Sequence, residues 1–184
     1  PCVTAFGQRP TEVKVGVNGV VVYVHPDNPV KVLMYDELEG IYTGKHRNWK
    51  QLGGKDAPIA VYGLSTNTAV GELFAEEVLG PKALSSEVHL MTDAELLKAI
   101  AYNPDSIGFA PLTQTQGIRP LTIKRVYSST PVEPTDETIS NRIYPISRFL
   151  YGYVDPAANQ GEIKTYLDWL RSNEGQAIAK QIGY

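Results

Sequence analysis

Cysteine is nearly absent from the sequence, since Cys2 is the only one among 184 residues. A single thiol can form neither an internal disulfide framework nor a cysteine-based zinc site. Positive charge is also scarce: 17 lysines and arginines face 20 aspartates and glutamates, for a formal net charge of −3. Because a general polyanion binder normally carries a basic stripe, we expect no nucleic-acid partner.

Long apolar runs are missing as well. No stretch of the sequence approaches the ~18 apolar residues that are needed to span a bilayer. The hydrophobic content of 42% and the charged content of 20% are those of a globular protein rather than a disordered chain. A chain of 184 residues is long enough for one domain, or two small ones, with a buried core.

Proline and glycine, with 13 and 16 copies, delimit many short elements. The patterns predict strands over 13–24, 59–63, 88–91, 106–110, 120–126 and 148–154. They predict helices over 33–43, from Thr68 to Gly80, from Thr92 to Asn103, over 159–171 and over 173–182. Residues 128–142, polar and with two prolines, are predicted to be a loop. Strands that alternate with helices indicate an α/β architecture with a mixed or mostly parallel sheet.

The strands over 13–24 and 148–154 bracket the middle of the chain. The first of them alternates in its first half and is almost continuously apolar in its second, which indicates that it becomes fully buried. If the two strands lie side by side, the chain has two lobes. Residues 26–146 then form an inserted lobe II, while residues 1–25 and 147–184 form a partial lobe I with the hinge strands.

The strongest candidate binding site is the polar run Ser65, Thr66, Asn67 and Thr68, between the strand at 59–63 and the helix that follows. The first turn of a helix has free N–H groups and the positive end of the helix dipole, which favour an anion. Three hydroxyls and one amide add neutral donors. The alternative is that Ser65 or Asn67 simply caps the helix, and the pattern by itself favours capping.

Signatures of catalysis and of metal binding do not occur. His25, His46 and His89 lie in different elements without metal-ligand spacing, and we expect them at the surface. No GxSxG, SxxK, GxxxxGK[ST] or GxGxxG motif is found. We therefore expect no enzyme, no cofactor and no metal site. Six carboxylates have the spacing of solvated helix faces: Asp36, Glu37, Glu39, Glu72, Glu76 and Glu77.

A small basic patch consists of Lys45, His46, Arg47, Trp49 and Lys50. Such a patch could meet a partner or a phosphate group. A lone tryptophan in a turn more often packs under the preceding helix, and we expect this of Trp49.

Several segments form a recognisable series. Gly19–Pro29 joins an apolar strand to an Asn-Pro turn, and Ile41–Gly54 contains Thr-Gly-Lys, Asn-Trp and Gly-Gly. Three more segments follow: Asn103–Phe109, Tyr144–Tyr151 and Ser172–Ile178, with Gly183-Tyr184 at the end. In this order, and over nearly the whole chain from about residue 9, they resemble the phosphate-binding proteins of bacterial ABC import systems.

The resemblance implies a fold of the type II periplasmic-binding-protein kind, with two α/β lobes joined by crossing hinge strands and a ligand in the cleft. It implies a non-catalytic solute-binding protein of an ABC importer. Its partners would be a small anion, phosphate or a related oxyanion, and an ABC permease in the membrane. The implied location is periplasmic or extracellular. Members often carry a lipid anchor on an N-terminal cysteine, which Cys2 by itself does not establish.

The chain departs from the family at its start. Members begin with a substantial segment before the glycine that opens the apolar strand, and that segment builds most of lobe I. It has no counterpart in this sequence. We therefore expect lobe I to be incomplete in this chain. The chain is then a fragment, one piece of a split or nicked protein whose lobe I a separate N-terminal segment completes, or a product with an incomplete first lobe.

A second departure concerns the ligand loop, where the family has an arginine followed by Ser-Gly-Thr. One alignment puts Leu64 at the arginine and Thr68–Val70 at Ser-Gly-Thr, and a two-residue slip puts Tyr62 and Thr66–Thr68 there. Either way the arginine is lost, and with it a charge-assisted contact of the kind that holds phosphate. We expect a small anion or polar ligand at Ser65–Thr68, but not tight phosphate binding. In the alternative reading, the chain is a sensor or interaction domain that has lost import function.

Overall fold

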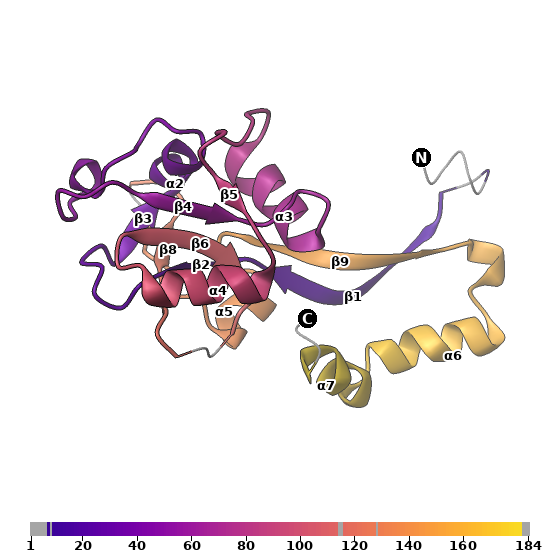
Figure 1. Ribbon diagram of the computed structural model, residues 1–184. Coiled ribbons are helices and arrows are strands. Elements are labelled where there is room, and N and C mark those ends of the chain that lie inside the picture. The colour runs from indigo at the N-terminus through magenta and orange to yellow at the C-terminus, as the bar shows by residue number, and fades with distance from the viewer. Residues whose placement is uncertain (1–6, 8, 114–115, 128, 182–184) are drawn as a thin grey trace. The chain divides into compact units, whose positions relative to one another are not determined.

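The computed structural model describes residues 7, 9–113, 116–127 and 129–181 (Figure 1). The chain forms two compact units. We call Pro1–Asn18 together with Arg148–Tyr184 unit 1, and Gly19–Ser147 unit 2. The chain therefore passes between the units twice, once after Asn18 and once after Ser147.

A five-stranded mixed sheet lies at the centre of unit 2, with the strand order β5-β4-β6-β2-β7. Its strands are β2 (Val21–Val24), β4 (Ala60–Gly63), β5 (His89–Leu90), β6 (Ser106–Ala110) and β7 (Arg119–Pro120). Strand β4 runs parallel to β5 and β6, whereas β2 is antiparallel to β6 and β7. A separate parallel pair joins β3 (Val32–Met34) to β8 (Thr122–Lys124). The predicted α/β architecture with a mixed sheet is confirmed.

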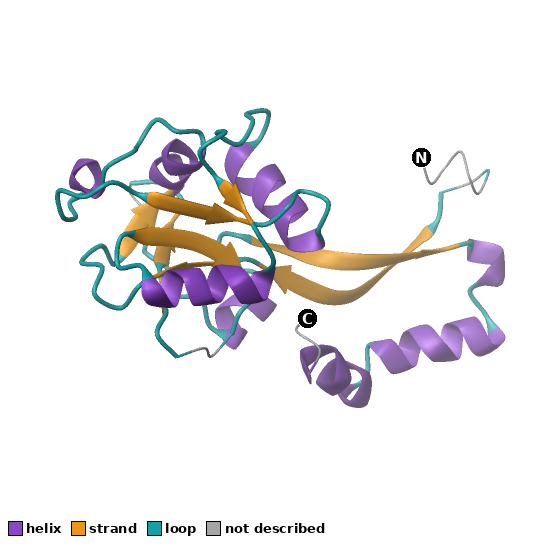
Figure 2. Ribbon diagram, viewed as in Figure 1, coloured by secondary structure: helices purple, strands orange, loops and turns teal. Residues whose placement is uncertain are grey.

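The helices of unit 2 pack around these strands (Figure 2). They are α2 (Tyr35–Tyr42), the 3₁₀ turn η1 (Trp49–Leu52), α3 (Ala69–Phe74), the π-helical turn η2 (Ala75–Leu79), α4 (Asp93–Tyr102) and α5 (Asp136–Ser140). Helix α4 begins with a capping box, in which Glu95 Oε2 accepts from Thr92 N at 3.0 Å and from Thr92 Oγ1 at 2.7 Å. Gly44 follows α2 with φ +81°, a conformation that favours glycine.

The buried hydrophobic core belongs entirely to unit 2, because every member falls between Val20 and Ile146. All four residues of β2 are 0% exposed, as the continuous apolar run predicts. Phe74 of α3 stacks on Phe109 of β6 with ring centroids 3.9 Å apart. The Tyr42 ring meets the Phe74 ring edge-on at 4.6 Å. These rings fix helices α2 and α3 on the sheet.

Three sequence predictions need correction at element boundaries. The strand over 13–24 is interrupted at Val20, where β1 (Thr11–Gly19) gives way to β2. The segment over 33–43 begins as strand β3 before α2 starts at Tyr35. The segment over 120–126 is divided between β7 and β8, because Leu121 N bonds Val22 O in one sheet while Thr122 N bonds Lys31 O beside the other.

The loop predicted over 128–142 contains a helix, α5, so that prediction is wrong over Asp136–Ser140. Thr135 caps α5, its Oγ1 accepting from Thr138 N at 3.1 Å. Ile139 then packs against the core. A Cβ at Gly19 would lie 2.6 Å from Ile139 Cγ2, so α5 sits directly against the start of unit 2. The polar composition of this segment predicts a loop, but the contact of Ile139 with the core stabilises a helix there.

Unit 1 consists of a two-stranded sheet and helices. Strand β1 pairs with β9 (Ser147–Val154), and their arrows point in opposite directions in Figure 1. After β9 come the 3₁₀ turn η3 (Pro156–Ala158), α6 (Gly161–Leu170) and α7 (Asn173–Gln181). The Gln176 amide joins α7 to the sheet and to α6, donating to Val15 O and to Leu170 O, both at 2.8 Å. The expected pairing of the two bracketing strands is confirmed, while the assignment of the units to lobes I and II stays a prediction.

Within the described ranges, every helix is too short or too polar to cross a bilayer.

Candidate functional site

The polar run Ser65–Thr68 forms a tight turn between β4 and α3. Thr68 is the N-cap of α3, because its Oγ1 accepts from Gly71 N at 3.1 Å. The same hydroxyl donates to Ser65 O at 2.8 Å, and Thr68 N donates to Ser65 O at 3.0 Å. Capping therefore falls to Thr68, not to Ser65 or Asn67, which corrects the capping alternative raised from the sequence.

Gly71 allows this turn to fold onto the helix. A Cβ at Gly71 would lie 2.1 Å from Ser65 O and 3.1 Å from Leu64 O. No side chain fits there unless the backbone shifts, so the loop conformation depends on the glycine. Ser65 Oγ accepts from Asn67 N at 3.2 Å, which closes the turn further.

The turn presents several polar groups to solvent. Thr66 and Asn67 are exposed and Ser65 is half-buried. Among the described residues, the side chains of Thr66 and Asn67 take part in no hydrogen bond, since Asn67 bonds Ser65 Oγ only through its backbone N–H. The first-turn N–H groups of α3 add donors, since a helix leaves its first N–H groups without a carbonyl partner. The turn therefore offers neutral donors to a ligand.

The loop and the strand and helix that flank it carry no cationic side chain of their own, because the sequence has no lysine or arginine between Lys55 and Lys82. The two residues that align with the family's arginine are both neutral and both engaged. Leu64 is 1% exposed and belongs to the core. The Tyr62 hydroxyl accepts from Asn103 Nδ2 at 3.3 Å. Neither Leu64 nor Tyr62 can therefore supply the charge-assisted contact that the family's arginine makes.

The three histidines lie in different surroundings. His89 is exposed, as expected, and His25 Nδ1 accepts from Asp27 N at 3.1 Å. His46 meets the surface prediction only in part, because the residue is half-buried and its ring packs over Gly40 with a buried Nδ1. Across the described ranges, no three histidine, cysteine or acidic side chains gather in a way that could hold a metal ion. Cys2 lies outside the described residues.

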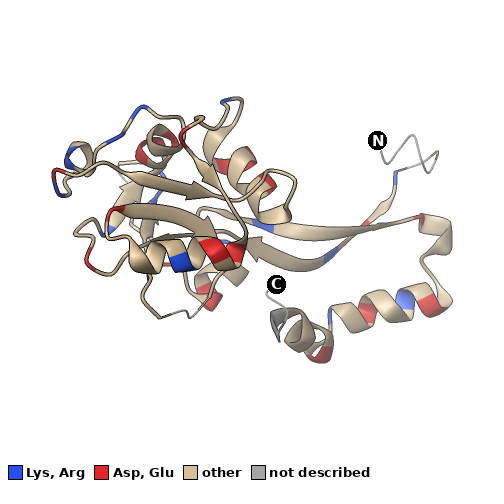
Figure 3. Cartoon of the chain, viewed as in Figure 1, with Lys and Arg blue, Asp and Glu red and all other residues tan. Residues whose placement is uncertain are grey.

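The basic patch at 45–50 is largely neutralised by its neighbours. Trp49 is 1% exposed, so the expectation that it packs inward is confirmed, and its indole N–H donates to Asp105 O at 2.8 Å. Arg47 pairs with Glu87 at 2.9 Å. Lys50 pairs with Asp56 at 2.8 Å, and its hydrogen bond, with that of Asn48, lowers the pKa of Asp56. Figure 3 shows that acidic and basic residues are interspersed over the described chain.

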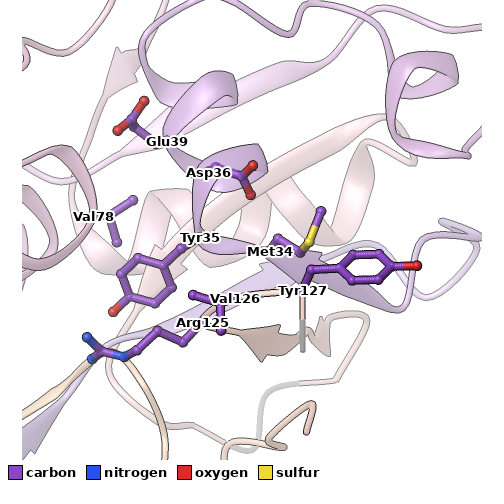
Figure 4. Close-up of a pocket in the computed structure, with 8 residues that line it drawn as sticks. All are labelled: Met34, Tyr35, Asp36, Glu39, Val78, Arg125, Val126 and Tyr127. Atoms are coloured by element: carbon purple, nitrogen blue, oxygen red, sulfur yellow. The ribbon is translucent and has the colours of Figure 1, made fainter. Parts of the chain in front are cut away.

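A groove of about 480 Å³ lies elsewhere on unit 2 (Figure 4). It is lined by Met34, Tyr35, Asp36, Glu39, Val78, Arg125, Val126 and Tyr127. Burial is the main reason that the pKa of the Tyr35 hydroxyl lies well above its usual range. None of the lining residues belongs to the turn at Ser65–Thr68, so the groove and the candidate ligand loop are separate features.

Known proteins resemble this chain over most of its length. Phosphate-binding protein PstS of Pseudomonas aeruginosa is 24% identical over 97% of this chain and 61% of its own length. Phosphate-binding protein PstS of Bacillus subtilis is 30% identical over 93% of this chain and 56% of its own length. The chain thus spans less than two thirds of the length of these relatives, whose names are those of binding proteins and not of enzymes.

A solved structure extends the comparison to the fold. A Clostridium perfringens protein, assigned as the substrate-binding protein of a phosphate ABC transporter and crystallised with bound phosphate, is 28% identical, with a TM-score of 0.72. The match covers 95% of this chain and 70% of that protein. The resemblance inferred from the sequence motifs is therefore confirmed. The sequence profile of the PBP superfamily domain matches residues 3–174, and the chain belongs to that family.

Proposed function

We propose that the protein to which this chain belongs is an extracytoplasmic solute-binding protein of an ABC importer that binds phosphate or a related small oxyanion. The observation that carries the proposal is the match of 93% or more of the chain to proteins named phosphate-binding. The relative with bound phosphate shares the fold. These relatives favour transport over the sensor alternative.

In this proposal the ligand meets the turn at Ser65–Thr68. The Ser65 hydroxyl, the Thr66 hydroxyl and the Asn67 amide donate to its oxygens, and the first-turn N–H groups of α3 add the positive end of a helix dipole. Thr68 acts differently, because its hydroxyl hydrogen is already donated to Ser65 O. It holds the turn in shape, and direct contact with the ligand would require that bond to break.

The donors of the turn at Ser65–Thr68 are all neutral, and this limits the affinity that we expect for an anion. A hydrogen bond from a neutral donor to an anionic ligand contributes about 1.5–3 kcal/mol, and an arginine would add two parallel bonds together with an opposite charge. Without an arginine in the loop, phosphate binding is expected to be weaker than in a protein that has one. Oxyanions of lower charge than phosphate, which need less charge compensation, should compete well at this site.

The test is isothermal titration of phosphate and sulfate into the product of the whole reading frame. We expect heat of binding, and Kd increases of about 10- to 100-fold for Thr66→Ala and for Asn67→Ala, as each removes one hydrogen bond to a charged ligand. Ser86→Ala, which truncates another exposed hydroxyl of unit 2, is the matched control and should leave Kd unchanged. Absence of heat with every oxyanion would refute the proposal, and loss of binding in the control would refute the assignment of the loop.

The partners follow from the same proposal. An ABC permease in the membrane would receive the closed, ligand-bound form, and ligand would shift an open–closed equilibrium between two lobes. The location would be periplasmic or extracellular, with a lipid anchor as one means of attachment. A separate N-terminal segment would complete the lobe to which unit 1 contributes. Fractionation of cells tests the location, and detection of an N-terminal lipid by mass spectrometry tests the lipid anchor.

A further inference from the structure

Two side chains of unit 2 converge on one backbone carbonyl, that of Pro145. The Tyr35 hydroxyl donates to Pro145 O at 3.0 Å, and Arg125 Nη2 donates to the same oxygen at 2.9 Å. The Arg125 guanidinium also lies over the Tyr35 ring, 5.1 Å from its centroid. The two donors come from α2 and from the residue after β8, so the carbonyl is held from two separate elements.

The residues around Pro145 are held just as firmly. Tyr144 is 0% exposed, and its N–H donates to Thr138 O at 2.8 Å. Ile146 O accepts from Val20 N at 2.9 Å. Ser147 Oγ donates to Tyr144 O at 2.6 Å. Each residue from Tyr144 to Ser147 therefore has a hydrogen bond that fixes it within unit 2.

The bond between Ile146 and Val20 ties together the two places where the chain passes between the units. Val20 is the second residue of unit 2, and Ser147 is its last. Gly19 is confined by Ile139, since a Cβ there would lie 2.6 Å from Ile139 Cγ2. Both chain crossings thus start from one small, closely packed region.

Burial decreases at the boundary of unit 2. Ser147 is 2% exposed, but the seven residues of β9 that follow are all half-buried or exposed. A change from a buried anchor to a more exposed strand suits a hinge, where a few residues at the end of an element absorb a change in backbone angles.

We propose that Tyr35 and Arg125 form a clamp on Pro145 that fixes where the chain leaves unit 2. They are positioning residues for the opening and closing on which the proposed function rests. Neither residue belongs to the ligand loop at Ser65–Thr68. The clamp borders the groove of Figure 4, where Tyr35 and Arg125 lie beside Val78 and Val126. Glu77 faces Arg125 at 3.7 Å and balances its charge.

The first test is hydrogen exchange of the Val20 amide in the ligand-free full chain. Tyr35→Phe and Arg125→Met each remove one bond to Pro145 O, and each should speed this exchange about 5-fold. The Leu121 amide, which donates to Val22 O at 2.8 Å in the neighbouring sheet, is the internal control. Faster exchange at Val20 with an unchanged Leu121 supports the clamp, whereas equal acceleration of both amides refutes it.

The second test measures the hinge directly, with spin labels at Lys98→Cys on α4 and Glu162→Cys on α6 in a Cys2→Ser background. Both labelled positions are exposed, one in each unit. The Tyr35→Phe/Arg125→Met pair should broaden the distribution of distances between the labels. The matched pair is Tyr42→Phe/Arg119→Met: Tyr42 donates to Tyr62 O and Arg119 donates to Asn28 O and Val30 O, and none of these acceptors lies in the segment from Tyr144 to Ser147.

A distribution that broadens only in the Tyr35/Arg125 pair supports the proposal, and one that is equal in both pairs overturns it. Both measurements are made without ligand. They therefore stand or fall independently of whether phosphate binds, and a failed titration would not affect them.

Discussion

The two units of this chain use apolar residues in opposite ways. Unit 2 buries them: its core includes Trp49, Phe74 and Phe109, each at most 1% exposed. Unit 1 leaves them half-buried or exposed, and α6 has no buried residue at all among those described. Its exposed large hydrophobic residues are Tyr151, Tyr153, Ile163, Tyr166 and Ile178.

This difference determines where the stability of the chain resides. Removing apolar surface from water contributes roughly 25 cal/mol per Å², so unit 2 gains most of the hydrophobic stabilisation. Unit 1 relies on one strand pair and on local contacts such as Lys14 Nζ, 3.4 Å from the centroid of the Phe149 ring.

The largest expected effect is that of Phe109→Ala. Truncation of a buried aromatic residue leaves a cavity and should lower the free energy of unfolding by about 3–5 kcal/mol. Tyr166→Ala in unit 1, at a residue 58% exposed, should change it by about 0.5 kcal/mol or less. Urea unfolding, followed by the fluorescence of the buried Trp49 in a Trp169→Phe background, measures both. Similar losses for the two variants would abolish the contrast between the units.

A pair of glycines gives the next largest difference. Gly71→Ala would place a Cβ 2.1 Å from Ser65 O in unit 2, and overpacking of this kind costs about 1–3 kcal/mol. Gly16→Ala in unit 1 would meet nothing closer than Leu150 Cδ1 at 3.9 Å. It should be neutral or stabilise by up to about 1 kcal/mol, because alanine loses less backbone entropy. Thermal unfolding compares them, and a stabilising Gly71→Ala would show that the turn relaxes freely.

Thr68→Ala tests the cap of α3 and should cost about 1 kcal/mol, since Gly71 N loses its acceptor. Its exposed neighbour is the control, and Thr66→Ala should leave stability within about 0.5 kcal/mol of the parent. The same urea experiment reports both variants. If Thr66→Ala were the more destabilising one, the assignment of Thr68 as the cap would be incorrect.

The smallest effects should appear as acid sensitivity. Hydrogen bonds from Thr92 lower the pKa of Glu95 in unit 2, and the hydrogen bond from Lys164 lowers the pKa of Asp168 in unit 1. A carboxyl whose pKa is lower in the folded state stabilises above its unfolded pKa, and that contribution is lost as the pH falls through the folded pKa. Glu95→Gln and Asp168→Asn should each flatten the fall in stability between about pH 5 and pH 2.

Carboxyl NMR titration of the two residues measures these pKa values directly. Amide hydrogen exchange measured along the chain at pH 4 then locates each effect. Glu95→Gln should change the exchange rates of α4, and Asp168→Asn should change those of α6. A Glu95 carboxyl that titrates at its ordinary value would remove the charge-assisted part of the α4 cap.

Local sequence signals were sufficient where one short segment makes its own contacts. The helix predicted from Thr92 to Asn103 corresponds to α4, whose Thr92–Glu95 capping box needs only neighbours in sequence. The buried strand Val21–Val24 followed from its apolar run. The polar turn at Ser65–Thr68 could be located in the same way, but not which of its residues caps α3, because that depends on how the turn folds over Gly71.

Residue types and their order along the chain are enough to identify the family, the α/β order of elements and the neutral character of the turn at Ser65–Thr68. The formation of α5 within a polar segment, the packing of His46 over Gly40, and the meeting of Tyr35 and Arg125 at Pro145 depend instead on contacts between distant parts of the chain. The residues of that last contact are 110 and 20 positions apart from Pro145 in the chain. No local pattern encodes such a contact, because it exists only once the strands between those residues have paired and brought them together.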